Sequence, residues 1–282
     1  METALQSVGD AELEVTEWGS GEPLVFVQTA LTADELLPVA REDALGGYRR
    51  IVYHRRGYAG SSPAVRPGSV PHDAADCARL LAALSIDHAH VVGFSYSGAV
   101  ALELAATEPQ RVSSLMLIEP PPVHTASAVE FRDANERLMQ TRDERGPAEA
   151  LDQFLSLVIG PGWRTTIEHW LPESSRQMEH DAATFFDCDM PALLSWNFGS
   201  DDARRITCPV MHIGGADSGP WFAQVRELML DWFPHADDIV IAGADHDLPL
   251  THSTEVARAI AGFLERQRPS GVTGDHSRDG RG

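Results

Sequence analysis

The chain has 282 residues, of which 43% are hydrophobic and 23% charged, and its formal net charge is −20. This composition is typical of a folded globular protein, and the length allows one large domain or two small ones. An acidic surface repels phosphate backbones, so the charge argues against a nucleic-acid partner.

Lysine and cysteine usage narrow the chemistry further. All 22 basic residues are arginines, so the lysine Schiff base of pyridoxal-phosphate enzymes and lysine aldolases is excluded. Cys77, Cys188 and Cys208 are far apart and form no CxxC pair, which argues against a disulfide framework or a zinc site. The first residues lack the basic and apolar regions of a signal peptide, and no apolar run reaches the ~20 residues of a membrane span. We therefore expect a soluble, cytoplasmic protein.

Short apolar runs bounded by turn residues predict strands at the beginning of the chain. Residues 11–18 (AELEVTEW) alternate between apolar and polar, directly after a hairpin-turn signal at Gly9–Asp10. The runs at 23–28 and 49–54 are more continuously apolar, as in strands buried on both faces of a sheet.

Helices and strands alternate over much of the remaining chain. The pattern predicts, in chain order, a helix at 72–84, a strand at 90–94, a helix at about 97–107, strands at 113–119, 208–215 and 237–243, and a last helix at 254–267. Such alternation is typical of βαβ units and predicts a mostly parallel sheet.

Residues 121–200 interrupt this alternation with helical stretches and no predicted strand. They follow a proline run, EPPPV at 119–123, which ends any continuing element, and they are rich in large apolar side chains. We interpret 121–200 as a helical lid inserted into a core made of residues 1–120 and 201–267. The tail at 268–282 is rich in Gly, Ser and charged residues, which predicts disorder.

The segment HVVGFSYSGAV, residues 90–100, places a serine between a strand and a helix. Gly93 to Ser97 has the pattern small-x-Ser-x-small, which a tight strand-to-helix turn needs because larger side chains would collide across it. Such a turn strains the serine backbone by about 1–3 kcal/mol and exposes its hydroxyl at the carboxyl edge of the sheet. The same pattern also fits Ser97. We favour Ser95, because only that frame places a glycine at the end of the strand.

A serine hydroxyl is a weak nucleophile without a base. His246, in GADHDLPLTH, follows the last predicted strand and is therefore expected at the same edge of the sheet as Ser95. His54, in YHRRG, is the alternative base. His88 and His90 form an H-x-H pair, but no third ligand accompanies them, so we expect no metal site.

A carboxylate should orient the imidazole. Asp217 follows the strand at 208–215 in the glycine-rich turn GGADSG, and the order serine, aspartate, histidine is that of nucleophile-elbow enzymes. Glu119, at the end of the strand at 113–119, is the competing acid, but three prolines follow it and direct the chain toward the insertion. We favour Asp217 and keep Glu119 as the alternative.

The stretches VVGFSYSGAVAL, YHRRGYAGSS, HIGGAD and GADH, taken together, resemble the α/β-hydrolase superfamily over about residues 10–120 and 200–267. The resemblance implies an α/β-hydrolase fold: a mostly parallel central sheet flanked by helices, with a helical lid inserted after the sixth strand. It also implies a serine nucleophile rather than the aspartate of haloalkane dehalogenases. By position, it assigns the oxyanion hole to the backbone N–H groups of Ala30 and Tyr96.

Two positions depart from the family pattern. Ser97 stands where glycine is usual two residues after the nucleophile, and Gln28-Thr29 replaces the His-Gly that commonly follows the third strand. The first change is mild because serine is small. The second removes a glycine, so the backbone of the loop can adopt fewer conformations. The exact reaction is therefore less narrowly defined by the resemblance.

The reaction implied is hydrolysis of an ester, a thioester or a carbonyl-adjacent C–C bond in a small hydrophobic substrate, through a Ser95-His246-Asp217 triad. We expect no metal, no organic cofactor and no membrane partner, and a homodimer is left open. Two other classes also stay open, because fold alone does not define function. One is a lyase, cyclase or cofactor-free oxygenase that uses His246 as a base, and the other is a small-molecule receptor.

Overall fold

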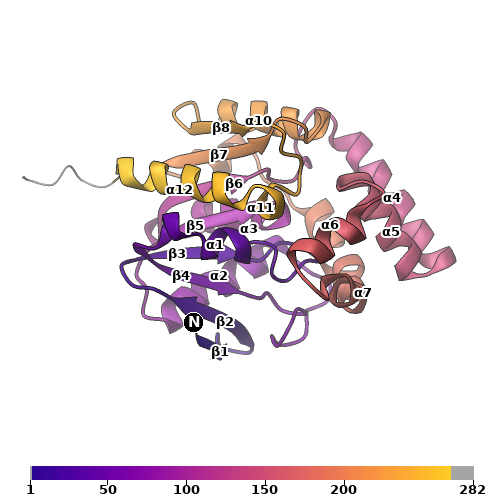
Figure 1. The fold of residues 1–282 in the computed structure, drawn as a ribbon, viewed down its shortest axis with the longest axis horizontal. Helices are drawn as coiled ribbons and strands as arrows, with labels where there is room; N and C mark the ends of the chain where they lie inside the picture. Colours follow the sequence, from indigo (N-terminus) through magenta and orange to yellow (C-terminus); the bar gives the residue numbers. More distant parts are fainter. Residues whose placement is uncertain (1, 268–282) are drawn as a thin grey trace, which may run out of the picture.

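The computed structural model describes residues 2–267, so the tail predicted to be disordered lies outside the described residues. Eight strands form one sheet in the order β1-β2-β4-β3-β5-β6-β7-β8 (Figure 1). The strands are β1 (Glu2–Ser7), β2 (Glu12–Trp18), β3 (Glu22–Val27), β4 (Tyr48–Tyr53), β5 (Ala89–Phe94), β6 (Val112–Ile118), β7 (Val210–Gly215) and β8 (Asp237–Ile241).

The strand directions confirm a mostly parallel sheet. β1 and β2 form an antiparallel hairpin around the turn at Gly9–Asp10, and β2 is also antiparallel to β4. The remaining pairs, from β4 through β3 and β5 to β8, are parallel. The carboxyl ends of these six neighbouring strands therefore meet at one edge of the sheet, where open α/β folds bind their ligands.

Helices cover both faces of the sheet because side chains of a strand alternate between its faces. Val25 and Val27 of β3 pack with α2 (Val70–Ala83), α3 (Tyr96–Thr107) and α10 (Pro220–Trp232). Leu24 and Phe26 point to the opposite face, with α1 (Leu37–Arg41) and α12 (Ser253–Gln267). The short helix α11 (Leu248–Thr251) precedes α12, and the 3₁₀ turns are η1 (Asp43–Leu45) and η2 (Pro109–Arg111).

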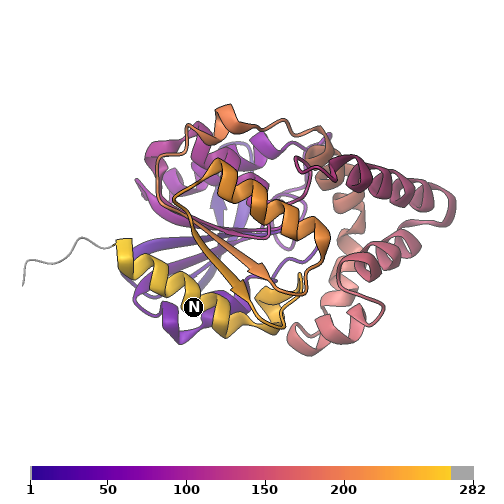
Figure 2. The same ribbon diagram turned by 90° about the horizontal axis from the view of Figure 1, so that it is seen from above.

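A helical insertion lies between β6 and β7. Its elements are α4 (Ala128–Arg145), α5 (Pro147–Val158), α6 (Trp163–Trp170), α7 (Ser174–Thr184), the π-helical turn η3 (Phe185–Asp189), α8 (Met190–Ser195) and α9 (Ser200–Ala203). Figures 1 and 2 show α4–α7 together at one end of the molecule. This block has its own buried core around Trp163, Ile167 and Phe186, to which Leu31 and Leu250 of the sheet domain contribute.

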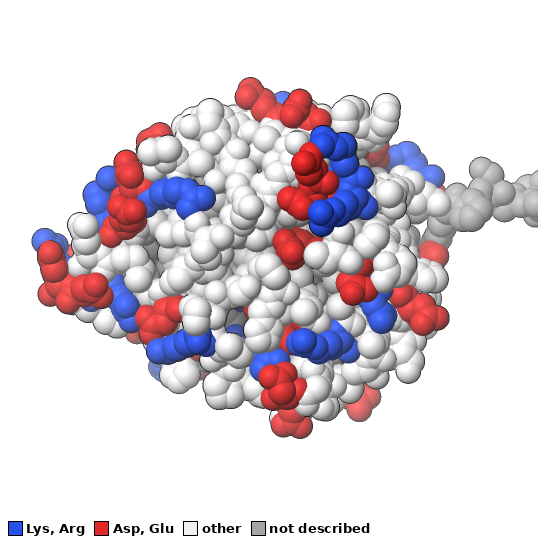
Figure 3. All heavy atoms as spheres, turned by 180° about the vertical axis from the view of Figure 1, so that it is seen from behind, with Lys and Arg blue, Asp and Glu red and all other residues white. Residues whose placement is uncertain are grey.

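Charged side chains of both signs are interspersed on one face of the molecule. On the face drawn in Figure 3, acidic side chains lie beside arginines around uncharged areas. No helix within residues 2–267 is long and apolar enough to cross a membrane. Over the same residues, no group of three or more His, Cys, Asp or Glu side chains is arranged to hold a metal ion.

Candidate active site

Ser95 sits on the turn between β5 and α3 with φ 48° and ψ −121°, a strained conformation for a residue with a side chain. Gly93 makes this turn sterically possible: a Cβ atom there would lie 2.4 Å from the Ser97 carbonyl oxygen and 2.8 Å from the Ala101 Cβ. The turn therefore has the geometry expected of a nucleophile elbow.

Ser97 has a different environment. Its side chain is fully buried, and its hydroxyl lies 2.9 Å from both the backbone nitrogen and the carbonyl oxygen of Phe94, accepting from the first and donating to the second. This small polar side chain closes the turn from inside, which explains why serine replaces the usual glycine. Ser95, and not Ser97, lines the adjacent cavity.

The structure brings Ser95 and His246 together across 151 residues of sequence. The His246 Nε2 atom lies 3.2 Å from Ser95 Oγ, and Nδ1 lies 2.7 Å from Glu119 Oε2. Two aromatic rings hold the imidazole plane. Phe222 stacks on it with centroids 4.0 Å apart, and Phe94 packs at 4.9 Å.

Glu119 is the carboxylate that contacts His246, and it is 1% exposed. Its second oxygen, Oε1, accepts a hydrogen bond of 2.8 Å from the Gly215 N–H at the end of β7. The residue has φ 41°, a strained backbone conformation that follows immediately after β6. Both carboxylate oxygens are thus engaged, which fixes the side chain toward the histidine.

The structure corrects the expectation that Asp217 holds the imidazole. The Asp217 residue is exposed, whereas the position on Nδ1 of His246 is occupied by Glu119. Asp217 supports the site through its backbone instead, since its N–H donates to the Ala244 carbonyl at 2.8 Å, two residues before His246. The turn after β7 therefore braces the histidine loop without supplying the acid.

His54, the alternative base, is paired elsewhere. Its Nε2 lies 3.0 Å from Asp34 and its Nδ1 lies 3.2 Å from Glu14. Burial lowers the pKa of His54, but the hydrogen bonds and charges of these two carboxylates outweigh it and raise the pKa. These contacts give His54 a structural ion pair away from Ser95.

Ala30 and Tyr96, the two residues assigned to the oxyanion hole, line the same cavity as Ser95 and His246. Tyr96 is the first residue of α3, so its N–H has no acceptor within the helix. The two unusual residues before Ala30 make contacts within the protein. The Gln28 Oε1 atom accepts from the Arg55 N–H at 2.7 Å, and the Thr29 hydroxyl donates to the Phe94 carbonyl at 2.9 Å.

The cavity over Ser95 has a volume of about 50 Å³ and a mainly apolar lining. Its walls come from both the sheet domain and the insertion: Ala30, Ser95, Tyr96, Pro121, Pro122, Phe131, Phe154, Val158, Phe185, Asp189, Met190, Leu193, Trp221, Phe222 and His246. A second cavity of about 50 Å³ shares Ala30, Ser95 and His246 with the first and includes Glu35 and Asp247.

The two carboxyl groups of the second cavity have perturbed acidity. Burial raises the pKa of Glu35 well above its ordinary value, and the charge of Asp247 adds to the effect while a hydrogen bond from Thr32 opposes it. Burial also raises the pKa of Asp247 to about 7, an effect that His246 opposes and Asp245 reinforces.

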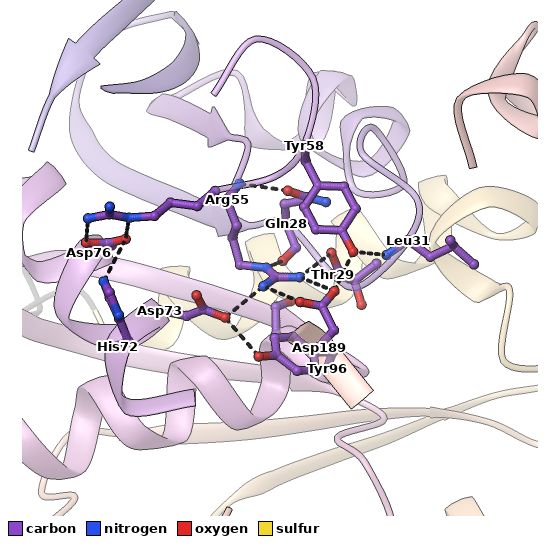
Figure 4. A network of polar contacts seen from close by, with 12 residues as sticks. Gln28, Thr29, Leu31, Arg55, Tyr58, His72, Asp73, Asp76, Tyr96 and Asp189 are labelled. Carbon is purple, nitrogen blue, oxygen red and sulfur yellow. Dashed lines mark hydrogen bonds and ion pairs between the residues drawn. The ribbon is translucent and has the colours of Figure 1, made fainter. Parts of the chain in front are cut away.

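Behind the cavity lies a buried polar network that the sequence did not reveal. Figure 4 shows the Arg55 guanidinium at its centre, between Tyr58 and Tyr96 and facing Asp73 and Asp189. Arg55 belongs to the YHRRG stretch, where the only available signal was the family resemblance. Asp189 lies in the insertion, 134 residues away, so no local pattern could connect the two.

Three comparisons with known proteins agree with the fold. Residues 34–253 match the family described as the alpha/beta hydrolase fold, and the chain belongs to this family. A putative carbamate hydrolase, RutD, from Pseudomonas syringae pv. syringae is 29% identical over 251 residues, covering 83% of this chain and 88% of the relative. Esterase YbfF of Escherichia coli is 26% identical over 257 residues, covering 86% and 92%. A thermophilic esterase structure from Thermogutta terrifontis superposes with a TM-score of 0.78 at 19% identity, covering 95% of this chain and all of that one.

These relatives are hydrolases and esterases of the same fold, and the chain is an enzyme of the α/β-hydrolase class. The family was expected from the sequence, and the match confirms it.

Proposed function

We propose that the protein is a serine hydrolase of small hydrophobic esters in which Ser95 is the nucleophile, His246 the general base and Glu119 the carboxylate that orients the histidine. The observation that carries this proposal is the continuous hydrogen-bonded chain from Ser95 Oγ through both nitrogens of His246 to Glu119. A nucleophile, a base and an orienting acid in this arrangement are the parts that acyl transfer requires.

In the proposed reaction, Ser95 Oγ attacks the substrate carbonyl carbon while His246 Nε2 accepts the hydroxyl proton. The carbonyl oxygen becomes an oxyanion facing the N–H groups of Ala30 and Tyr96, a contribution of roughly 3–4 kcal/mol per donor in enzymes of this type. The C–O bond to the alcohol then breaks, and His246 returns the proton to the leaving oxygen. Water, deprotonated by His246, attacks the acyl-enzyme and releases the acid, which restores Ser95.

The cavity supports a substrate with a short apolar group. Its lining is mainly apolar, but its volume of about 50 Å³ is well below the roughly 300 Å³ of a typical ligand pocket. A substrate larger than a few atoms therefore requires the insertion to move, and we propose that the insertion acts as a lid. The esterase among the relatives supports an ester substrate, and the carbamate hydrolases support a related carbonyl chemistry.

The proposal is tested with Ser95→Ala and Ser97→Ala on 4-nitrophenyl esters of two to eight acyl carbons, together with covalent labelling by a fluorophosphonate. We expect Ser95→Ala to lose both turnover and labelling. Ser97→Ala should be labelled and active but less stable, because it loses two buried hydrogen bonds. Labelling and turnover that persist in Ser95→Ala would overturn the assignment. Unlabelled wild-type enzyme that releases no acid from any ester would favour the lyase or receptor alternatives.

A further inference from the structure

Arg55 contacts the loop that leads to the proposed oxyanion hole. Its Nε–H donates to the Gln28 carbonyl at 3.0 Å and its Nη2 group donates to the Thr29 carbonyl at 3.2 Å. These are the two carbonyl groups immediately before Ala30, so they set the orientation of the peptide that carries the Ala30 N–H.

The remaining donors of Arg55 face two carboxylates, Asp189, which is buried, and Asp73, whose side chain is 16% exposed. Nη1 donates to Asp73 at 2.7 Å and to Asp189 at 3.0 Å, and Nη2 donates to the second oxygen of Asp189 at 2.8 Å. An arginine has five N–H donors in a rigid planar fork. Five contacts account for all of them, so the position of this guanidinium is fully determined.

Two tyrosines extend the network to both proposed donors. The Tyr58 hydroxyl donates to Asp189 and accepts the Leu31 N–H at 2.9 Å, on the far side of Ala30. Tyr96 packs its ring 4.3 Å from the Arg55 guanidinium and donates its hydroxyl to Asp73 at 2.8 Å.

Residues 28–31, which we call the oxyanion loop, need such support because their backbone is strained at Leu31. Leu31 has φ 68°, which a side-chain-bearing residue adopts at a cost and retains only where its surroundings enforce it. The Tyr58 hydroxyl holds the Leu31 N–H in this conformation.

Asp189 is the member of the network that comes from the insertion. It ends the π-helical turn η3, and the same segment is docked on the loop after β4 at further points. The Thr184 hydroxyl donates to the Gly57 carbonyl at 3.1 Å, and a Cβ atom on Gly68 would lie 2.4 Å from the Cys188 carbonyl oxygen.

We propose that Arg55 and Asp189 form a positioning pair that makes the geometry of the oxyanion hole depend on the docking of the helical insertion. The proposal rests on the proposed function, in which Ala30 and Tyr96 stabilise the oxyanion. With the insertion docked, Asp189 fixes Arg55 and Tyr58, and these hold the backbone on both sides of Ala30. When the insertion lifts to admit substrate, Asp189 leaves, and Arg55 keeps only Asp73 as a charged partner. The oxyanion donors then align only after the insertion has closed over the substrate.

Arg56 offers a matched control, because it is the neighbouring residue and is also buried in an ion pair. It binds both oxygens of Asp76 at 2.6 and 3.1 Å, and its other carboxylate partner is Asp10. Neither partner belongs to the oxyanion loop or the insertion. Replacing Arg56 therefore removes a comparable ion pair without touching the proposed positioning contacts.

The experiment compares Arg55→Lys, Asp189→Asn and Arg56→Lys with the wild-type enzyme. We measure kcat and KM on 4-nitrophenyl butyrate, the melting temperature, and the affinity for butylboronic acid, which forms a tetrahedral adduct with the nucleophile.

Lysine keeps the charge of Arg55 but cannot reproduce its fork of donors. We expect Arg55→Lys to lower kcat by roughly 10²–10³-fold, the loss seen when one oxyanion donor is removed, with KM changed less than about threefold. Boronate affinity should fall in parallel, and Asp189→Asn should lose about tenfold in kcat. Arg56→Lys should lower the melting temperature but leave kcat within about threefold.

Equal losses of kcat in Arg55→Lys and Arg56→Lys would overturn the proposal, as would a raised KM with unchanged kcat and boronate affinity. Both results would give Arg55 a merely structural or substrate-binding role.

Should Arg55→Lys fail to fold, the test uses Tyr58→Phe, because this change removes only the hydroxyl between Leu31 and Asp189. A tenfold loss of kcat in that variant supports the proposal, and wild-type kcat overturns it. The control for the proposed function is separate: fluorophosphonate labelling of Ser95 in every variant shows that the nucleophile is intact.

Discussion

Two carboxylates follow adjacent parallel strands but differ in burial and in their contacts with His246. Glu119 follows β6 and Asp217 follows β7, which pair side by side in the sheet. Glu119 is buried and contacts both His246 and Gly215, whereas Asp217 is exposed and contacts the histidine loop only through its backbone. A place at the carboxyl edge of the sheet is therefore not sufficient to make a carboxylate the partner of the histidine.

The difference arises at the end of β7. His246 follows β8, so a carboxylate from β6 must pass the end of β7 to reach it. The backbone of β7 holds the side chain on this path, since the Gly215 N–H donates to Glu119 Oε1. The GGADSG turn that made Asp217 attractive thus provides a backbone donor for Glu119 instead.

The largest effect expected from this comparison is in turnover. Glu119→Gln keeps the shape of the side chain but favours the wrong imidazole tautomer, so we expect kcat to fall on the order of 10⁴-fold, as with the corresponding change in serine proteases. Asp217→Asn should stay within about threefold of wild type, because its backbone contact is retained. Both variants are measured on one 4-nitrophenyl ester, with circular dichroism as a control for folding. A crippled Asp217→Asn enzyme beside an active Glu119→Gln enzyme would reverse the assignment.

A smaller effect should follow from crowding the turn after β7. Gly215→Ala places a Cβ atom 2.4 Å from the Ala244 carbonyl oxygen, so the histidine loop must shift. We expect kcat to fall about 10–100-fold, since a displacement of 1 Å in a catalytic group can cost that much.

The matched control for this change is Gly262→Ala in α12, where the new methyl group meets only the end of the Arg266 side chain, at 3.5 Å. Alanine favours helix over glycine, so this variant should be fully active and slightly more stable. If Gly215→Ala kept wild-type kcat, the loop after β7 would not position His246.

The smallest effect concerns a third carboxyl group, that of Asp247. It is about as deeply buried as Glu119, but its oxygens accept fewer hydrogen bonds. Its Oδ2 atom has no hydrogen-bond partner among the described residues, and burial raises its pKa to about 7 against 3.8 ordinarily. Between these values the folded chain binds more protons than the unfolded chain, so the free energy of unfolding falls as the pH rises from about 4 to 7.

Asp247→Asn removes this cost of ionisation. At pH 8 we expect its melting temperature to exceed that of wild type by on the order of 5 °C, and at pH 4.5 the gain should largely vanish. Differential scanning calorimetry at the two pH values measures the change. If the difference in melting temperature were the same at both pH values, ionisation of Asp247 would not limit stability. Burying this carboxyl group without a partner for Oδ2 would then cost little.

Local patterns determined the fold class and two members of the proposed triad. Strand and helix periodicities do not depend on distant contacts, so the parallel sheet and the helices α2, α3 and α12 could be predicted with bounds close to those observed, whereas α1 and α10 were not predicted. Ser95 could be proposed from the sequence because the strand, the turn and the helix around it are contiguous. His246 could be proposed because the loops that follow parallel strands emerge at the same edge of the sheet.

Only the tertiary structure decided between Glu119 and Asp217. The choice depends on the positive φ of Glu119 and on the hydrogen bond that the Gly215 N–H donates to it from a neighbouring strand, and neither is a property of a short segment. The same holds for Arg55 and Asp189, which are 134 residues apart and meet only when the insertion docks on the sheet domain. A buried ion pair has no periodic pattern along the chain, because its energy comes from the removal of water and the geometry of donors and acceptors in three dimensions.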